Sequence, residues 1–516
     1  MSDFKFLSVL TVAPLVGALV VALLPRHKPT LAKQVAFVWS LALFVLTVVM
    51  WATFEAAGDR FQFRESYPWI DTWNVRFTLE VDGIALVMIA LVTLLVPLVI
   101  LASWHDAENA QAAGGKRSVP AFFALLLALE SMMIGVFAAG DVFLFYVFFE
   151  VMLVPMYFLI GSYGGARRQY AAVKFFLYSL VGGLFMLAAV IGLWVVSDPH
   201  TFDWQTLTSQ EFATWTERWL FLGFFVAFAV KAPFFPFHTW LPDAGGAAPA
   251  GAAALLVGVL DKVGTFGILR YCLPLFPNAS DYFAPLALTL SLVGIIYAAL
   301  LAVGQNDLKR LVSYTSIAHF GFIGVGIFAF TTQAGSGSVL YMVNHGLATG
   351  LLFLVVGMLV TRRGSALVSD FGGAGKLIPV LAGVFFIAGL ASLAMPGTAP
   401  FISEFLVLIG AFTVNKPVAI VATLGIILAA GYVLWMVQRT TQGTPNPELH
   451  NVPAMRRDIS AREVAVVAPL IALLLVFGFY PKPLLNVINP AVAATMQDMG
   501  KQDPAPTVAT NQEASK

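Results

Sequence analysis

Residues 142–160 read VFLFYVFFEVMLVPMYFLI, an apolar run interrupted by one charged residue, Glu150. About 20 apolar residues cross the roughly 30 Å hydrocarbon core of a bilayer, so this run is long enough to span a membrane. A charge at that depth costs about 2.5–3.5 kcal/mol on insertion scales. Three further apolar runs hold Lys231 (within 221–240), Lys262 (within 253–269) and Glu404 (within 391–410). Two acidic and two basic residues at such depth indicate charge pairing and the movement of protons or ions.

The composition is that of an integral membrane protein. Of its 516 residues, 59% are hydrophobic and 11% are charged, whereas soluble domains carry about 25% charged residues. The net charge of +1 gives no reason to expect a nucleic-acid partner. The single cysteine, Cys272, excludes an internal disulfide framework and a cysteine-ligated cluster. We therefore expect no metal and no redox cofactor bound by this chain.

Hydropathy predicts an all-α polytopic membrane protein with about fourteen transmembrane helices. The expected spans are 5–24, 34–54, 82–104, 119–139, 141–162, 170–197, 217–240, 248–274, 283–304, 310–331, 336–361, 378–411, 416–439 and 463–485. Lys and Arg lie in every odd-numbered connection except the seventh. The positive-inside rule therefore predicts that these loops face the cytoplasm and that both termini lie outside.

Two of the spans are interrupted by proline. Pro233 and Pro236 follow Lys231, and Pro396 and Pro400 precede Glu404. A proline inside a helix removes one backbone hydrogen bond. In lipid, the freed carbonyls must be satisfied by protein or water, so such breaks line cavities. Two broken spans five spans apart indicate two inverted five-helix repeats, each containing a broken helix.

These features divide the chain into five parts. The alternating residues 74–81 predict a strand of an external hairpin between the second and third spans. The expected parts are 1–118 (three transmembrane helices with the hairpin), 119–274 (first five-helix repeat), 283–439 (second, inverted repeat), 440–499 (a loop and the C-terminal helix) and 500–516 (a disordered tail).

Seven motifs give the chain a specific resemblance. They are DVFLFYVFFEVMLVPMYFLIGSYGG (141–165), YAAVKFFLYSL (170–180), VKAPFFPFHTWLPDA (230–244), LDKVGTFGILRY (260–271), NDLKRLVSYTSIAHFGFIG (306–324), YMVNHGLATGLLFLVVG (341–357) and MPGTAPFISEF (395–405). In this order they resemble the antiporter-like membrane subunits of respiratory complex I, NADH:quinone oxidoreductase. The chain is most similar to the M type, the counterpart of mitochondrial subunit 4, because Glu404 stands where the L and N types carry lysine. Two alternatives remain open: a subunit of a multi-subunit Na⁺/H⁺ antiporter of the Mrp type, and a passive membrane scaffold.

The resemblance implies a function and its partners. The chain would move protons from the cytoplasm to the outside, coupled to electron transfer in partner subunits. Those partners would hold NADH, FMN, iron–sulfur clusters and quinone, while this chain would hold no cofactor. Its neighbours would be L-type and N-type antiporter-like subunits in a bacterial plasma membrane. Protons would enter through the first repeat and leave through the second.

The resemblance also implies a set of proton-relay residues. Glu150 would pair with Lys231, Lys262 would be the central lysine, His319 and His345 would join the two half-channels, and Glu404 would be the last proton site. Three further residues are weaker candidates: Glu130, Lys174 and His238. The family's usual histidine is replaced by Gly245. Asp261 is an unusual neighbour of Lys262, but adjacent helix residues do not share a face.

Each role has a structural alternative. Glu150 and Lys231 could form a static ion pair that fixes helix packing. The two lysines Lys174 and Lys262 could extend their ammonium groups to a membrane interface. A histidine in a core helix can be hydrogen-bonded structure, and Glu404 could bond to backbone freed at the second break.

Overall fold

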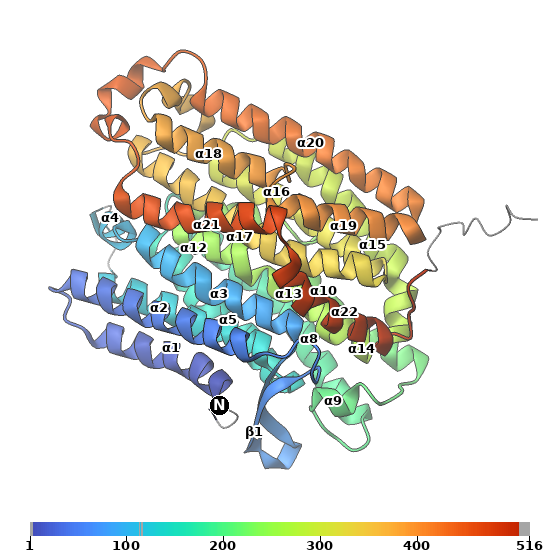
Figure 1. Ribbon diagram of the computed structural model, residues 1–516. Coiled ribbons are helices and arrows are strands. Elements are labelled where there is room, and N and C mark those ends of the chain that lie inside the picture. The colour runs from blue at the N-terminus through green and yellow to red at the C-terminus, as the bar shows by residue number, and fades with distance from the viewer. Residues whose placement is uncertain (1–3, 113, 115–116, 505–516) are drawn as a thin grey trace, which may run out of the picture.

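The computed structural model describes residues 4–112, 114 and 117–504, in which long helices lie side by side and a β-hairpin projects from one end (Figure 1). The main elements are α1 (Phe6–Leu23), α2 (Pro29–Thr53), β1 (Gln62–Ile70), β2 (Val75–Val81), α3 (Gly83–Ala102), α4 (Asp106–Ala112), α5 (Val119–Ala138), α6 (Val142–Val151), α7 (Leu153–Tyr163), α8 (Arg168–Val196), α9 (Trp204–Leu207), α10 (Thr214–Lys231), α11 (Leu241–Ala247), α12 (Ala250–Leu255), η2 (Leu256–Leu260), α13 (Lys262–Gly267), η3 (Ile268–Cys272), α14 (Leu273–Leu275), α15 (Pro277–Val303), α16 (Leu308–Phe328), α17 (Thr332–Arg363), α18 (Pro379–Ser392), α19 (Ala399–Val414), α20 (Lys416–Thr441), α21 (Ala461–Phe479) and α22 (Lys482–Asp498).

The prediction of an all-α polytopic membrane protein is confirmed. Among the described residues, twelve helices or continuous helical runs are long and apolar enough to cross a bilayer. The two broken spans, α10 and the pair α18–α19, bring the number to the expected fourteen. The run from α12 to α14 is buried along its whole length, and α16 and α17 are nearly so. These three runs therefore form the centre of the bundle.

The first break follows from Pro233. Because proline has no N–H, the Ala229 carbonyl instead accepts from Phe234 N at 2.9 Å. This shift leaves the Val230 carbonyl without its helical partner, and the Trp240 indole nitrogen donates to it at 2.9 Å. The helix therefore ends at Lys231, and α11 resumes after nine residues.

The second break separates α18 from α19. Pro396 and Gly397 lie between them, and Gly397 has a φ of +94°, in the left-handed region that favours glycine. Asn344 of α17 donates through Nδ2 to the Ala399 carbonyl at 2.9 Å. Ser403 donates to the Pro400 carbonyl at 2.9 Å. At the end of α18, the Gly389 and Leu390 carbonyls accept from Leu393 N and Met395 N, both at 3.0 Å, so the backbone there is bonded within the protein.

The two ends of the bundle differ in charge. At one end, which we call the basic face, lie the connections between α1 and α2 and between α20 and α21 (left in Figure 1), which contain Arg26 and Arg456. Arg362, at the end of α17, pairs with Glu463 at the start of α21, and Arg167 and Arg310 lie at the starts of α8 and α16. The other end, the hairpin face, carries the antiparallel strands β1 and β2, whose register pairs Gln62 with Val81 and Ile70 with Val75. Both ends of the described chain lie on the hairpin face.

Two contacts fix the ends of the described chain there. The Leu7 amide donates to Glu65 of β1 at 3.0 Å. Lys501 pairs with Asp281, at the beginning of α15, at 2.8 Å. The remainder of the expected disordered tail, residues 505–516, lies outside the described residues.

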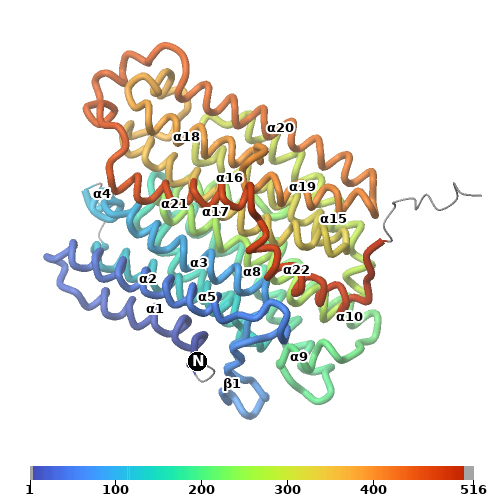
Figure 2. Tube along the Cα trace, viewed as in Figure 1, coloured from blue at the N-terminus to red at the C-terminus, as the bar shows by residue number. Residues whose placement is uncertain are grey.

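The C-terminal segment differs from the expectation of one span over 463–485. α21 ends at Phe479, and after a sharp turn α22 continues to Asp498 (red in Figure 2). Pro481 and Pro483 explain the end of α21, because proline favours the start of a helix over its interior. α22 packs its apolar side, including Val487 and Ile488, against α3, α14 and α17.

Candidate functional site

Glu404 lies in the first turns of α19, beside the second break. Its side chain is 6% exposed, and its Oε2 accepts a hydrogen bond from the Tyr341 hydroxyl at 3.3 Å. The Ala399 and Pro400 carbonyls beside the break accept from Asn344 and Ser403. Glu404 makes no hydrogen bond to the backbone of the break among the described residues.

Lys262 lies at the centre of the bundle, at the start of α13. It is fully buried, and its Nζ lies 2.6 Å from Nδ1 of His345 on α17. The same Nζ donates to the Val257 carbonyl, five residues earlier in the π-helical segment η2. π-turns within α-helices are frequent at functional sites. Lys262 thus has partners inside the protein and does not extend to a membrane interface.

Two histidines connect Lys262 with the second break. The His345 Nε2 lies 3.1 Å from the Ser316 hydroxyl of α16. The rings of His345 and His319 are 5.2 Å apart between centroids, and the His319 ring is 5.8 Å from that of Tyr341. A buried row of polar groups therefore runs from Lys262 through His345, His319 and Tyr341 to Glu404.

Glu150 and Lys231 do not form the direct ion pair that the resemblance implied. Among the described residues, no N–O contact within 4 Å joins them, and Glu150 Oε1 and Lys231 Nζ are both buried without a hydrogen-bond partner. The Glu150 carboxylate lies against Gly183 of α8, whereas the Lys231 ammonium lies 4.6 Å from the Phe149 ring centroid. The two charges remain within Coulombic range of each other.

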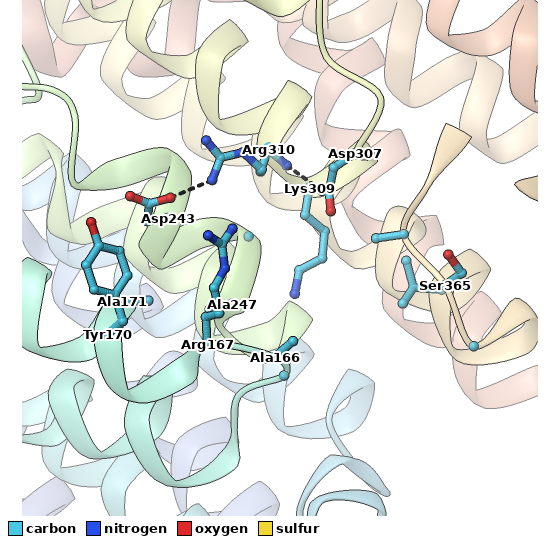
Figure 3. A pocket seen from close by; sticks show the side chains of 15 residues that line it. Ala166, Arg167, Tyr170, Ala171, Asp243, Ala247, Asp307, Lys309, Arg310 and Ser365 are labelled. Atoms are coloured by element: carbon cyan, nitrogen blue, oxygen red, sulfur yellow. Dashed lines mark hydrogen bonds and ion pairs between the residues drawn. The ribbon is translucent and has the colours of Figure 1, made fainter. Parts of the chain in front are cut away.

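Lys174 pairs with a residue that lines a polar cavity on the basic face. It pairs with Asp243 of α11 at 2.8 Å, and Asp243 also pairs with Arg310 at 2.5 Å. The charged residues that line a cavity of about 340 Å³ here include Asp243, Arg310, Arg167 and Lys309 (Figure 3). Figure 3 shows the Arg310 and Asp243 side chains pointing toward each other, joined by a dashed line. Lys174 therefore belongs to a charged network beside this cavity.

The two remaining weak candidates lie outside this row. Glu130 of α5 is fully buried, and neither carboxylate oxygen has a partner among the described residues. His238 lies in the first break, between the rings of Phe235 and Tyr297, at 5.8 and 5.3 Å between centroids. Neither residue contacts the row from Lys262 to Glu404 through any hydrogen bond among the described residues.

The hairpin face carries a second charged cluster. Glu80 of β2 accepts from Gln205 at 3.0 Å and lies 3.4 Å from Arg64. Burial raises the pKa of Glu80 to about 7, and the charges of Arg270 and Arg64 limit that rise. Arg270 in turn pairs with Asp82 at 2.6 Å. These contacts attach the hairpin to the end of the buried α12–α14 run.

Sequence reasoning missed Tyr341, Asn344 and Asp243. Tyr341 precedes His345 by four residues, so the two share one face of α17. That spacing was a usable signal, although a tyrosine in an apolar helix is common. Nothing in the sequence marked Asn344 as the partner of a backbone carbonyl 55 residues away. No group of His, Cys, Asp and Glu able to hold a metal occurs in the described part of the chain.

The fold and the family model define the class of protein. Residues 139–429 match the model described as NADH:quinone oxidoreductase/Mrp antiporter, TM. The fold is similar to a chain in the respiratory complex I of Thermus thermophilus with bound NADH, with a TM-score of 0.85, 29% identity and coverage of 96% of this chain and 100% of that chain. A chain of the Mrp complex from Dietzia sp. DQ12-45-1b has a TM-score of 0.82 at 20% identity, covering 97% and 100%, which shows the fold alone. The chain is thus an antiporter-like membrane protein.

The curated relatives narrow this class. NADH-quinone oxidoreductase subunit M of Mycobacterium tuberculosis is 48% identical over 540 residues, covering 99% of this chain and 97% of the relative. NADH-ubiquinone oxidoreductase chain 4 of Arabidopsis thaliana is 39% identical, covering 95% and 97%. The chain therefore belongs to the family of subunit M of NADH-quinone oxidoreductase, the proton-translocating subunits in the membrane arm of respiratory complex I.

Family membership decides between the earlier alternatives. The predicted M type is confirmed by 48% identity across nearly the whole chain. The Mrp-type antiporter shares the fold, yet its chain is only 20% identical. The protein is thus a multi-pass membrane subunit that works with other subunits of complex I.

Proposed function

We propose that protons cross this subunit along the row from Lys262 through His345, His319 and Tyr341 to Glu404. The proposal is supported by the continuity of this row inside an otherwise apolar bundle. The row begins with the 2.6 Å contact between Lys262 and His345 and ends with the 3.3 Å hydrogen bond between Tyr341 and Glu404. Histidine titrates near neutral pH and exchanges protons at either ring nitrogen, which suits a relay.

The first repeat supplies Lys262 with protons. Glu150 is half-buried and Lys231 is buried, and the Glu150 Oε1 and Lys231 Nζ atoms have no hydrogen-bond partner among the described residues, so either residue can change its charge without breaking a formed ion pair. Asp243, which lines the cavity on the basic face, and Lys174, which pairs with it, provide polar groups where protons enter. Glu130 and His238 have no such link and remain secondary candidates. In this scheme residues 119–274 take protons up and residues 283–439 release them.

The driving energy comes from partner subunits. A proton crossing against 100 mV requires about 2.3 kcal/mol. We assign NADH, FMN, iron–sulfur clusters and quinone to those partners, and an L-type and an N-type antiporter-like subunit to the two sides of this chain. Redox steps there would shift the charge of Glu150 and Lys231 through the contact between neighbouring subunits.

The direction of transport follows from the charged loops. The basic face carries most of the loop arginines and lysines, so we place it in the cytoplasm. The hairpin face, with both termini, then lies outside the plasma membrane of a bacterial cell. Protons move from the basic face toward the hairpin face.

The substitution Glu404→Gln tests the proposal. The amide keeps size and can accept from Tyr341 but cannot carry a proton, so NADH-driven proton translocation per assembled complex should fall by at least about tenfold. Glu217→Gln is the matched control, because Glu217 is also buried and, among the described residues, accepts only from Ala279 N and Asn278. Normal translocation by Glu404→Gln complexes would refute the relay.

A further inference from the structure

Asp261 is a buried acid that the relay above does not use. It stands between the π-helical segment η2 and α13, at the centre of the bundle. Its side chain is fully buried, and neither carboxylate oxygen has a hydrogen-bond partner among the described residues. A buried, unpaired carboxylate is costly unless a nearby positive charge compensates it.

Asp261 lies on the helix face that packs against α10. Gly264 is one turn later on the same face. A Cβ on Gly264 would meet Phe228 O at 2.5 Å and Ala232 N at 2.6 Å, so the two helices touch there without side chains between them. Lys231 lies between those two contacted residues. Asp261 therefore stands on the side of its helix that packs against the end of α10, where Lys231 lies.

Lys262 lies on a different face, which packs against α17. Gly258 is four residues earlier on that face, and a Cβ on Gly346 of α17 would meet Gly258 O at 2.7 Å. The Lys262 ammonium contacts His345 one residue before Gly346. The adjacent residues Asp261 and Lys262 thus lie on helix faces that pack against α10 and α17, respectively.

We propose that Asp261 carries protons from Lys231 to Lys262 and so joins the two half-channels. This inference rests on the proposed relay and adds its missing link, since the row of polar groups begins only at Lys262. In the first step the Lys231 ammonium gives a proton to the Asp261 carboxylate, leaving a neutral amine and a carboxylic acid. In the second, the acid passes that proton to the neutral Lys262 amine and becomes a carboxylate again.

The net charge of the three groups stays at zero throughout these steps. At first Lys231 is positive and Asp261 negative; then all three are neutral; finally Asp261 is negative and Lys262 positive. A direct transfer between two lysines without the acid would instead keep one uncompensated positive charge in the apolar centre. Since such a charge is costly when buried, the acid lowers the barrier between the repeats.

The experiment compares Asp261→Asn with Asp261→Glu in the assembled complex. NADH-driven proton translocation in membrane vesicles is expressed per complex, which removes differences in assembly. We expect Asp261→Asn to lose at least about tenfold, because a positioned proton carrier contributes about 10²–10⁴-fold. Asp261→Glu keeps the acid and should recover most of that loss. Glu217→Gln, which removes a buried carboxylate from the other end of α10, should translocate normally.

The outcomes separate this inference from the relay itself. Normal translocation by Asp261→Asn, together with its loss in Lys262→Met, overturns the role of Asp261 and leaves the relay standing. Normal translocation by Lys262→Met overturns the relay. If Asp261→Asn fails to assemble, infrared difference spectra of the unaltered complex and Asp261→Glu decide instead. A carboxyl C=O band that shifts with the longer side chain supports the proton-carrying role, and an unshifted band overturns it.

Discussion

Replacing Tyr341 with phenylalanine removes one hydroxyl from the end of the relay. Phenylalanine keeps the ring that lies 5.8 Å from the His319 ring, and Tyr341 is 1% exposed, so the ring remains buried. The lost group is the sole hydrogen-bond donor to the Glu404 carboxylate among the described residues. The ionised form of Glu404 is therefore destabilised selectively.

The size of the effect follows from the geometry. A hydrogen bond to a charged group contributes about 1.5–3 kcal/mol. The observed 3.3 Å is longer than the usual O–H···O distance of about 2.7–2.8 Å, so the lower end applies. About 1.4 kcal/mol corresponds to a tenfold change in rate. Release of the proton from Glu404, and with it NADH-driven translocation, should slow by about tenfold.

The assay uses inverted vesicles that contain the assembled complex. NADH oxidation and the acidification of the vesicle lumen are followed together and normalised to complex content. Tyr432→Phe is the matched control, because the Tyr432 hydroxyl is buried without a partner among the described residues, so its removal should change the rate by less than about twofold. Equal rates for Tyr341→Phe and the unaltered complex would refute the path through Tyr341.

Two further predictions concern other charged groups. Glu150→Gln and Lys231→Met should each strongly reduce translocation, and the double change should be little worse than either, because the effects of residues that act as one unit are non-additive. Fully additive losses in vesicle assays would contradict this coupling. Recovery of complex yield in the double variant would indicate a purely structural pair. On the hairpin face, burial raises the pKa of Glu80 from 4.5 to about 7, so its contribution to stability is complete below pH 4.5 and is lost as the pH rises through 7. Hydrogen exchange of β2 should therefore quicken between pH 5 and 8 beyond the intrinsic rate, and Glu80→Gln should remove that excess; an unchanged profile in the variant would contradict the assignment.

The sequence was sufficient for the spans and for the buried charges, for one physical reason. A bilayer requires long apolar helices and penalises every ionisable residue inside them, so both signals are strong and local. Lys262 and Glu404 were found in this way, whereas His345 was implied by the resemblance, and all three lie along one row in the structure.

Other features depend on contacts that no local pattern encodes. The Glu150 carboxylate lies in the space that Gly183 leaves open on another helix. No local sequence pattern shows that space, so an ion pair with Lys231 was expected although the structure lacks it. The π-helical segment before Lys262 arises within an ordinary apolar run. The turn between α21 and α22 was signalled by Pro481 and Pro483, but hydropathy alone extended the last span across it.

The breaks in α10 and α18–α19 acquire a common meaning from their partners. At the first, the carbonyl freed by proline accepts from a neutral donor, Trp240, and beside the second a neutral side chain, Asn344, donates to the Ala399 carbonyl. A charged residue used for this purpose would be held in one state, because losing its charge would also lose the backbone bond. Since neutral groups do this work, Lys231 and Glu404 remain able to gain and lose protons beside an irregular backbone. A break maintained by uncharged side chains is therefore what allows an ionisable residue next to it to act in transport.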